Sequence, residues 1–376
     1  MNSNSSQAST NASIIFPLLV DHLHQLMDLG PKEVAVCSVY VLLTWVYDLF
    51  PMVPILRAIA PFSSGKTRLI EGVLMPLVYC PFKTEGGSPT PANLRRTMMD
   101  QHREGLATLI VEDVGFDVEP RTEPADLLIN RCRQGGSASY QAPDGHGGYR
   151  QIREVIFGPT MLGSRVAFSD VAVESRILDI DLAAQDRTDR VLPDPPWKDK
   201  EPDHLVALLA NFRQQILSAP NPNKLPRIQG VEDRIWDVGW PLVWLTDTSQ
   251  DPGAMELVVE FLRLRSEALA DDKGEEPVVM VIGALVAISI QSGKIPANPP
   301  SILLSEIRDH IYQTSRAQIS SRQIGKLCRS PLNLVVFTSS GQKKVRSIDW
   351  AQLRQIGARF GFKDELLESQ YGGPEK

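Results

Sequence analysis

A Gly-Lys-Thr turn that follows a short apolar run is the feature that most constrains this chain. The stretch RAIAPFSSGKTRLIE, residues 57–71, fits the pattern G-x-x-x-x-G-K-[ST] except that Ala60 replaces the first glycine. Apolar residues before the turn predict a buried strand, and those after it predict a helix with one apolar face. In such a strand–loop–helix, the loop N–H groups and the helix N-terminus form a concave site for phosphates.

The turn therefore predicts a binding site for ATP and Mg²⁺. Lys66 is expected to reach the β- and γ-phosphates, and the Thr67 hydroxyl is expected to ligate Mg²⁺. Ala60 stands at the strand end, where a small side chain is tolerated. The predicted cofactor-binding set is Ser63, Ser64, Gly65, Lys66, Thr67 and Arg68. The alternative is a chance Gly-Lys-Thr sequence in an ordinary turn.

A second apolar run, TLIVEDV, ends in two acidic residues, Glu112 and Asp113. Carboxylates at the end of a neighbouring strand hold Mg²⁺ and polarise the attacking water in nucleotide hydrolysis. We therefore expect both acids to join Thr67 at the metal and to act with Lys66 in catalysis. Taken in order, Glu112 is the metal ligand and Asp113 activates the water. The alternative is a pair of ordinary acids at a strand end.

Two residues further along are candidates for contact with the γ-phosphate. EVIFGPT is predicted to end a strand at Thr160, the place of a γ-phosphate sensor. ESRILDIDL places Arg176 before the next strand, where ring ATPases carry an arginine that reaches the neighbouring subunit's nucleotide. Arg165 competes with Arg176 for this role, and either arginine could instead be an ordinary surface residue.

Strands and helices alternate through the first half of the chain, which predicts an α/β fold with a three-layer core. The linker and the tails are recognised by their composition. The predicted divisions are a disordered tail (1–12), an N-terminal helical segment (13–52), a nucleotide-binding core (53–186), a linker with a helical lid region (187–299), a winged-helix domain (300–363) and a flexible tail (364–376).

The most apolar segment, residues 34–50, is expected to be a buried core helix. It has 17 residues, contains Asp48 and stops at Pro51, whereas a membrane span needs about 20 apolar residues. A membrane-associated helix is the alternative. The polar N-terminus lacks the basic region of a signal peptide, and the four cysteines are scattered. These features predict a cytoplasmic protein with no membrane partner.

Positive charge is concentrated near the C-terminus. Residues 301–362 hold ten Lys/Arg against three Asp/Glu, a net +7, although the whole chain carries −6. The helix–helix–strand–loop–strand order of this region predicts a winged helix that binds DNA. The predicted DNA contacts are Arg322, Lys326 and Arg329 on the second helix, and Lys343, Lys344 and Arg346 in the wing. A winged helix used only for protein contacts is the alternative.

Several stretches together resemble the P-loop ATPases of phages, plasmids and integrative elements. They are the apolar run with its turn (40–71), TLIVEDV, VIFGPTMLGSR with ESRILDIDL, and DRIWDVGWPLVWLTDT. These ATPases are of the primase-associated helicase type, related to superfamily 3 helicases and to the AAA+ class. The resemblance covers about residues 35–260. Two departures are Ala60 and the order Glu112-Asp113, since the family usually has Asp-Glu.

The resemblance implies that the hairpin before the sensor strand grips DNA in the channel of a ring. This hairpin is SYQAPDGHGGYRQIR, and its DNA-contacting candidates are Tyr140, His146 and Arg150, with Tyr149 beside them. Aromatic rings and cations suit stacked bases and phosphates. A plain surface hairpin is the alternative.

Taken together, the sequence predicts a homo-oligomeric, ring-forming ATPase that moves along or remodels DNA, such as a helicase of a mobile element. One alternative is a nucleotide-gated DNA-binding switch with slow or absent hydrolysis, which the reversed Glu112-Asp113 pair favours. Another is an interaction protein of a replication or defence assembly.

Overall fold

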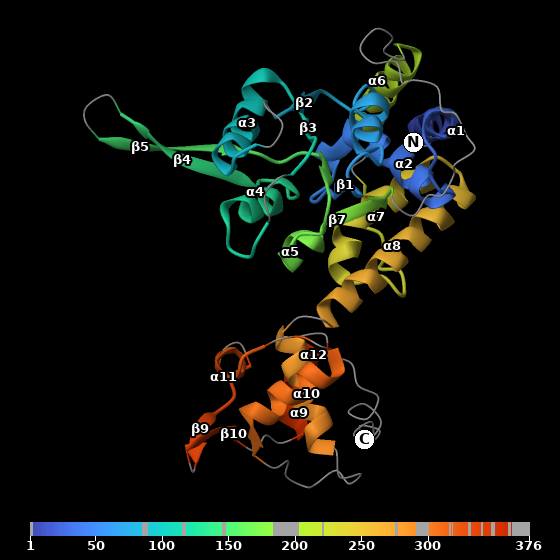
Figure 1. The fold of residues 1–376 in the computed structure, drawn as a ribbon. Helices are drawn as coiled ribbons and strands as arrows, with labels where there is room; N and C mark the ends of the chain where they lie inside the picture. The colour runs from blue at the N-terminus through green and yellow to red at the C-terminus, as the bar shows by residue number, and fades with distance from the viewer. Residues whose placement is uncertain are drawn as a thin grey trace. The chain divides into compact units, whose positions relative to one another are not determined.

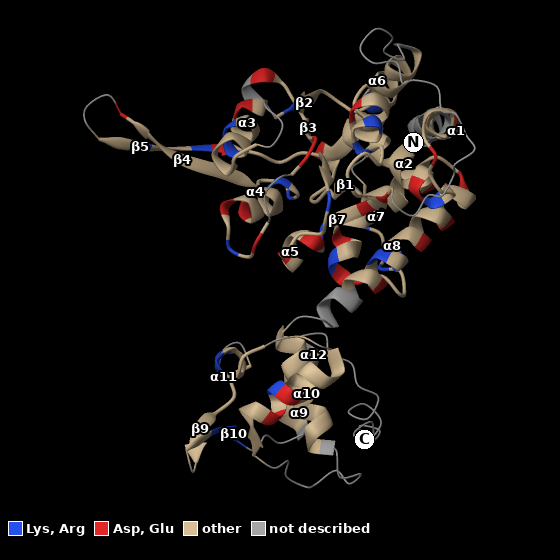
Figure 2. Cartoon of the chain, viewed as in Figure 1, with Lys and Arg blue, Asp and Glu red and all other residues tan. Residues whose placement is uncertain are grey.

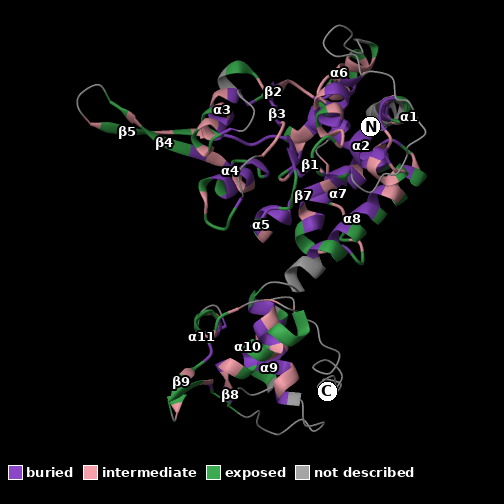
Figure 3. Cartoon of the chain, in the orientation of Figure 1, coloured by how far each residue is buried: buried purple, intermediate pink, exposed green. Residues whose placement is uncertain are grey.

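The chain folds into two compact units, Met1–Ser266 and Glu267–Lys376. The computed structural model describes the residues 3–84, 89–114, 118–144, 148–182, 203–219, 222–274, 277–290, 301–315, 317, 319–329, 332–339, 341–346, 350–359 and 362. Each unit has its own buried core and is described by itself below (Figures 1 and 3).

A five-stranded parallel sheet forms the centre of the first unit. The sheet has the order β2-β3-β6-β1-β7, and every pair of neighbouring strands is parallel. The strands are β1 (Ile55–Ile59), β2 (Pro81–Lys83), β3 (Thr108–Val111), β6 (Thr160–Ser164) and β7 (Ile177–Asp181). All residues of β3 and β6 are buried, as expected for a parallel sheet covered on both faces. The predicted mixed α/β fold is confirmed.

Helices complete this unit. They are α1 (Ser3–Leu26), α2 (Pro31–Val46), α3 (Pro91–Glu104), α4 (Glu123–Arg131), α5 (Val171–Glu174), α6 (Asp203–Leu217), α7 (Asp233–Thr248) and α8 (Pro252–Gly274) as far as Ser266, with a 3₁₀ turn at Tyr47–Leu49. Residues Val34 to Val46 of α2 are all buried, and α2 contacts α1, α6 and α7. The prediction of a core helix at 34–50 is therefore confirmed. Among the described residues, no helix has the length and hydropathy needed to cross a bilayer.

The structure differs from the sequence-based expectation at two helices. The first helix begins at Ser3, inside the segment predicted to be disordered, because 3–16 contains no glycine or proline to stop it. The helix after the Gly-Lys-Thr turn is short and is a π-helix over Arg68–Leu74. Pro76 follows two residues after Leu74 and cannot continue a regular helix.

A long antiparallel hairpin extends from the sheet domain (Figure 1). Its strands, β4 (Ser137–Pro143) and β5 (Tyr149–Val155), pair through seven residue pairs from Ser137–Val155 to Pro143–Tyr149. Most of its side chains are exposed, although β4 contacts α4 and β5 contacts α3. A two-stranded ribbon exposed on both faces is marginally stable by itself, so its base must be held firmly.

Arg131, at the end of α4, holds this base to the sheet. Its guanidinium is fully buried and donates to the carbonyls of Ile156, Ala107 and Pro159 at 2.7–2.9 Å, and also to the Gln101 side chain. Its Nε donates to Thr160 Oγ1 at 2.8 Å. Within the described part of the chain no carboxylate pairs with it, and burial lowers the pKa of Arg131 to about 10. Neutral oxygen acceptors, most of them backbone carbonyls, therefore stabilise this charge.

A second buried cluster joins α8 to β1, α5 and β7. Arg57 of β1 donates two hydrogen bonds to Glu174 at 2.5 and 2.8 Å and two to Asp179 at 2.5 and 2.9 Å. Arg265 of α8 contacts the same two carboxylates at 2.8 and 3.1 Å. Two cations and two anions thus balance each other in the interior.

The second unit packs four helices against a small antiparallel sheet of order β8-β10-β9. Its elements are α9 (Pro277–Ile290), β8 (Ile302–Leu303), α10 (Leu304–Ser315), α11 (Ser321–Arg329), β9 (Val336–Ser339), β10 (Gln342–Val345) and α12 (Trp350–Arg359). The sequence assigned 277–290 to the preceding lid region, but α9 packs into the core of this unit because it is apolar nearly all round.

Replacing Arg131 with methionine is expected to destabilise the first unit, because five buried acceptors each lose one hydrogen bond. We expect the free energy of unfolding in urea to fall by about 3 kcal/mol or more. The matched control is Arg133→Met, since Arg133 is exposed and its guanidinium donates, among the described residues, only to the nearby Asn130 side chain. That control should change the value by less than about 0.5 kcal/mol. Equal losses in both variants would contradict this role of Arg131.

Candidate nucleotide site

The Gly-Lys-Thr loop follows β1 and lies at the carboxyl edge of the parallel sheet. Its backbone takes left-handed conformations at Ser63, with φ of 62°, and at Gly65, with φ of 91°. Glycine adopts this region freely, whereas a serine there is uncommon and costs about 1 kcal/mol or more. Strain held in a loop of this kind is typical of functional sites.

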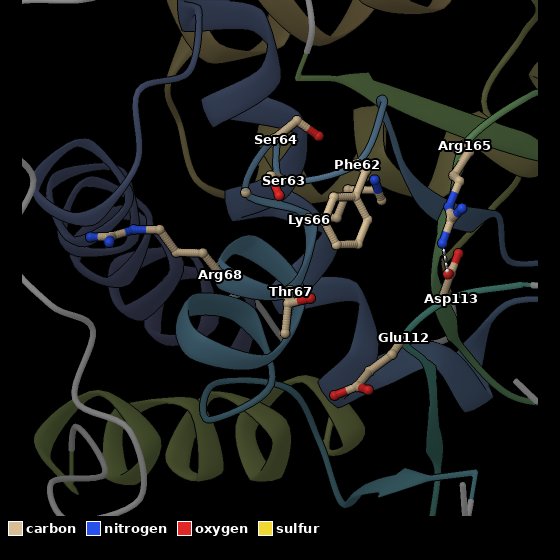
Figure 4. Close-up of a pocket in the computed structure, with 10 residues that line it drawn as sticks. Phe62, Ser63, Ser64, Lys66, Thr67, Arg68, Glu112, Asp113 and Arg165 are labelled. Atoms are coloured by element: carbon tan, nitrogen blue, oxygen red, sulfur yellow. Dashed lines mark hydrogen bonds and ion pairs between the residues drawn. The ribbon is translucent and has the colours of Figure 1, made fainter. Parts of the chain in front are cut away.

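A cavity of about 300 Å³ opens at this loop (Figure 4). The segments that follow β1, β3 and β6 meet there although they are far apart in the sequence. The lining residues are Phe62, Ser63, Ser64, Gly65, Lys66, Thr67, Arg68, Glu112, Asp113 and Arg165. The structure thus brings together the whole predicted loop and the predicted acidic pair.

Lys66 folds back onto its own loop. Its Nζ donates to the carbonyl oxygens of Ala60 and Pro61, both at 2.6 Å. Burial lowers the pKa of Lys66, Asp113 opposes that shift by attraction, and Arg165 adds to it by repulsion. A phosphate in the cavity would offer the ammonium a charged partner in place of two neutral carbonyls.

Glu112 follows β3, and it contacts the same lysine as Glu71 of the π-helix after the Gly-Lys-Thr loop. Lys83, the last residue of β2, contacts Glu112 at 2.7 Å and Glu71 at 2.6 Å. The second oxygen of Glu71, Oε1, is buried and has no partner among the described atoms. The positive charge of Lys83 therefore reduces the repulsion between the carboxylates of Glu71 and Glu112.

Asp113 lies on the other side of the cavity. Its Oδ2 accepts from Arg165 Nη2 at 2.9 Å, while its Oδ1 is buried without a partner in the described structure. The same arginine lies over the ring of Phe62 at 5.7 Å, and that ring is 80% exposed. Carboxylate and hydroxyl oxygens are the ligands that Mg²⁺ prefers, so Thr67, Glu112 and Asp113 are a donor set that fits the metal.

The side chains of Ser64 and Arg68 point in different directions. Ser64 Oγ donates to the Pro61 carbonyl at 2.6 Å, which tightens the loop. The Arg68 side chain turns away from Lys66 and donates to the Leu26 carbonyl at 3.0 Å (Figure 4). Arg68 can therefore serve a phosphate only through its backbone N–H.

The placement of Thr160 at a strand end was wrong. Thr160 is the first residue of β6, opposite Ile55 at the start of β1, and lies at the sheet edge away from the cavity. Its hydroxyl accepts from buried Arg131, and its backbone pairs with the Tyr40 hydroxyl at 2.7 and 3.0 Å. The strand begins there because Pro159 precedes it, and Ser164 with Arg165 occupies its carboxyl end.

Arg176 also lies at the amino edge, directly before β7, and does not enter the cavity of its own chain. Only 9% of it is exposed, and Nη1 donates to the Ala172 carbonyl of α5. Its Nε is buried without a partner in the described structure, and burial lowers the pKa of this guanidinium.

The candidate nucleic-acid residues of the hairpin fall on both faces of the ribbon. Tyr140 and Arg150 share one face, because Tyr140 pairs with Ile152 and Ala142 with Arg150. Tyr149 is 72% exposed on the opposite face. Arg95 of α3 lies over the Tyr140 ring at 6.0 Å. His146 lies outside the described residues.

On the second unit, the predicted basic residues are exposed. Ile324 and Cys328 of α11 are buried, so Arg322, Lys326 and Arg329 lie on the outer side of that helix. Ser320 caps the helix through its hydroxyl, which accepts from the Gln323 N–H at 3.3 Å. Of the residues predicted to lie in the wing, Lys343 and Arg346 are exposed and Lys344 is half-buried.

Sequence reasoning missed two residues of the cavity region, Glu71 and Lys83. Glu71 stands four positions after Thr67, on the same helical face, and that spacing could have identified it. Lys83 ends the strand beside β3, but strand order is not readable from one sequence. Arg165 was considered as a trans arginine or as an ordinary surface residue, and the structure places it in the cavity of its own chain.

No family model matches this chain. A search of curated proteins likewise finds no match. Among solved structures, the apo NrS-1 C-terminal region is 12% identical and aligns over 93% of this chain and 76% of that chain, with a TM-score of 0.35. An active helicase, SCCmec type IV Cch, is 9% identical over 96% and 72%, with a TM-score of 0.38. The JCV helicase is 14% identical over 75% and 66%, with a TM-score of 0.27. These values are too low to assign a fold or a function.

Replacing Lys83 with methionine is expected to tighten metal binding at the cavity, because Glu112 loses a neighbouring positive charge. Mn²⁺ is a suitable probe, since it shares the oxygen ligands of Mg²⁺. With saturating ADP, the Mn²⁺ concentration at half-saturation, followed by loss of the free-ion paramagnetic resonance signal, should fall about three- to fivefold. Lys32→Met, which breaks a distant pair with Glu260, is the control and should have no effect. Unchanged or weaker Mn²⁺ binding in Lys83→Met would contradict this expectation.

Proposed function

We propose that this protein is a P-loop ATPase that acts on DNA. The observation that carries the proposal is the meeting of the 61–67 loop with Glu112, Asp113 and Arg165 around one cavity. Phosphates are favoured there by the loop N–H groups, the helix start and two cations. The parallel order of β3, β6 and β1 supports a core of the P-loop NTPase type.

The roles of the side chains follow from their positions. Lys66 exchanges the Ala60 and Pro61 carbonyls for the β- and γ-phosphate oxygens of ATP. Thr67 and Glu112 hold Mg²⁺, which supplies charge neutralisation at the phosphates when it is bound. Asp113, whose buried Oδ1 has no partner in the described structure, is the group that orients the attacking water and takes its proton. Arg165 fixes the direction of that carboxylate.

The DNA-binding parts are proposed from charge and shape. Contact with DNA through Tyr140 and Arg150 would explain why the β4–β5 hairpin is long and exposed. In the second unit, the order helix, strand, two helices and two strands, together with the sheet order β8-β10-β9, supports a winged helix. Exposed Arg322, Lys326 and Arg329 on α11 are then the duplex contacts.

A ring of identical subunits is part of the proposal. The ring would bring Arg176 of one subunit toward the nucleotide of the next subunit, and DNA would pass through its central channel. The protein would act in the cytoplasm. Arg176 would have to leave its contact with α5 to do so. The arginine Nε that lacks a partner in the described structure is the feature that supports such a change.

A nucleotide-gated switch without turnover is the second candidate. It is favoured because both acids are already paired with cations, Glu112 with Lys83 and Asp113 with Arg165. The shorter carboxylate in the second position would also reach the water less well. Both candidates bind ATP, and only the first hydrolyses it.

Turnover of ATP, with and without single-stranded DNA, separates the two candidates. We expect wild-type turnover that DNA stimulates, a loss of at least about 100-fold in kcat/KM for Lys66→Ala, and a similar loss in kcat for Asp113→Asn. Lys224→Ala, which removes an exposed pair with Asp237, should retain wild-type rates. No turnover by the wild type, with ATP binding lost only in Lys66→Ala, would favour the switch. Turnover that is equal in wild type and Lys66→Ala would refute the enzyme.

A further inference from the structure

The small sheet of the second unit has two faces of opposite character. Its pairing register places Ile302, Val345 and Val336 in one row across the three strands. Ile302 and Val345 are buried, and Val336 packs against the same core. This inner face is therefore closed by the helices of the unit.

The outer face carries the alternate residues. Its first row is Leu303, Lys344 and Phe337, again in register across the strands. The next row continues with Arg346, whose N–H donates to the Val335 carbonyl at 2.8 Å. Val335 is 56% exposed and Phe337 36% exposed, and neither belongs to the core of the unit.

This register separates the three basic wing residues that the sequence grouped together. Lys343 pairs with Thr338 and lies on the inner side of the ribbon, beyond the core. Lys344 and Arg346 lie on the outer face, Lys344 opposite Phe337 of β9 and Arg346 opposite Val335, the residue before β9. Side chains opposite each other in such pairs are about 5 Å apart, so each cation is adjacent to an apolar contact.

We propose that this outer face binds single-stranded nucleic acid. An exposed ring can stack on an unpaired base, and the neighbouring ammonium and guanidinium can contact the phosphates on either side of it. Bases within a duplex are already stacked on each other and do not offer a face to Phe337. The inference goes beyond the proposed function, since α11 contacts duplex in that account and this face needs no nucleotide.

Charge favours a nucleic acid over a protein as the occupant. Residues 301–346 hold eight Lys/Arg against two Asp/Glu. The basic residues of α11 and β10 stand out in Figure 2, and the two acids, Glu306 and Asp309, belong to α10. An apolar protein partner would bury Lys344 and Arg346 without a counter-charge, which costs free energy.

The test is equilibrium binding of fluorescein-labelled oligothymidylate, and of a duplex of equal length, to the full chain without nucleotide. Fluorescence anisotropy gives both affinities. Phe337→Leu keeps apolar bulk and removes the ring, so single-strand affinity should fall about fivefold or more while duplex affinity stays within about twofold. Phe337→Tyr, which keeps the ring, should bind as the wild type does.

A charge pair on each surface provides the matched comparison. Removing both cations of the outer face, with Lys344→Gln and Arg346→Gln, should reduce the salt dependence of single-strand binding by about 1.4 in log–log slope. The same change on α11, with Arg322→Gln and Lys326→Gln, should act on duplex binding instead. The proposal is overturned if the single-strand affinity of Phe337→Leu is within about twofold of the wild-type value. In that case the outer face binds a protein or has no partner. The proposal is equally overturned if both substrates lose affinity alike.

Discussion

Parallel pairing of β1 with β6, and of β6 with β3, is the constraint on which the site depends. Parallel strands end at the same edge of a sheet, so the residues that follow each strand must meet there. Ile59 pairs with Ser164, and Val111 with Leu162, which brings the 61–67 loop, Asp113 and Arg165 to one cavity. None of these segments is close to the others along the chain.

The amino edge of the same sheet is held by a buried arginine. Arg131 contacts residues next to β3 and β6 and the residue that follows β5, so one side chain ties the exposed hairpin to the strands that carry the site. Thr160 belongs to this arrangement, because its hydroxyl is an acceptor for Arg131. A displacement of the hairpin base would therefore also displace β3 and β6, the strands that Asp113 and Arg165 follow.

The loop and the acidic pair could be predicted from sequence because each is encoded locally, as an apolar run followed by polar residues. Thr160 was misplaced because the apolar run around Pro159 does not reveal where a strand begins. Lys83 and the paired state of Asp113 depend on strand order and on side-chain direction, which a single sequence does not contain. The separation of Lys343 from Lys344 likewise depends on register, since a shift by one residue exchanges the faces.

Hydrogen exchange of the loop amides tests the central claim most directly, because the claim is that backbone N–H groups cradle phosphates. Adding Mg²⁺ and ADP should slow exchange across residues 62–67 in the wild type, and the slowing should be lost in Lys66→Ala. The second unit, including α11, should be unaffected in the absence of DNA. Unchanged exchange in this loop at saturating nucleotide, or protection only elsewhere in the chain, would contradict the account.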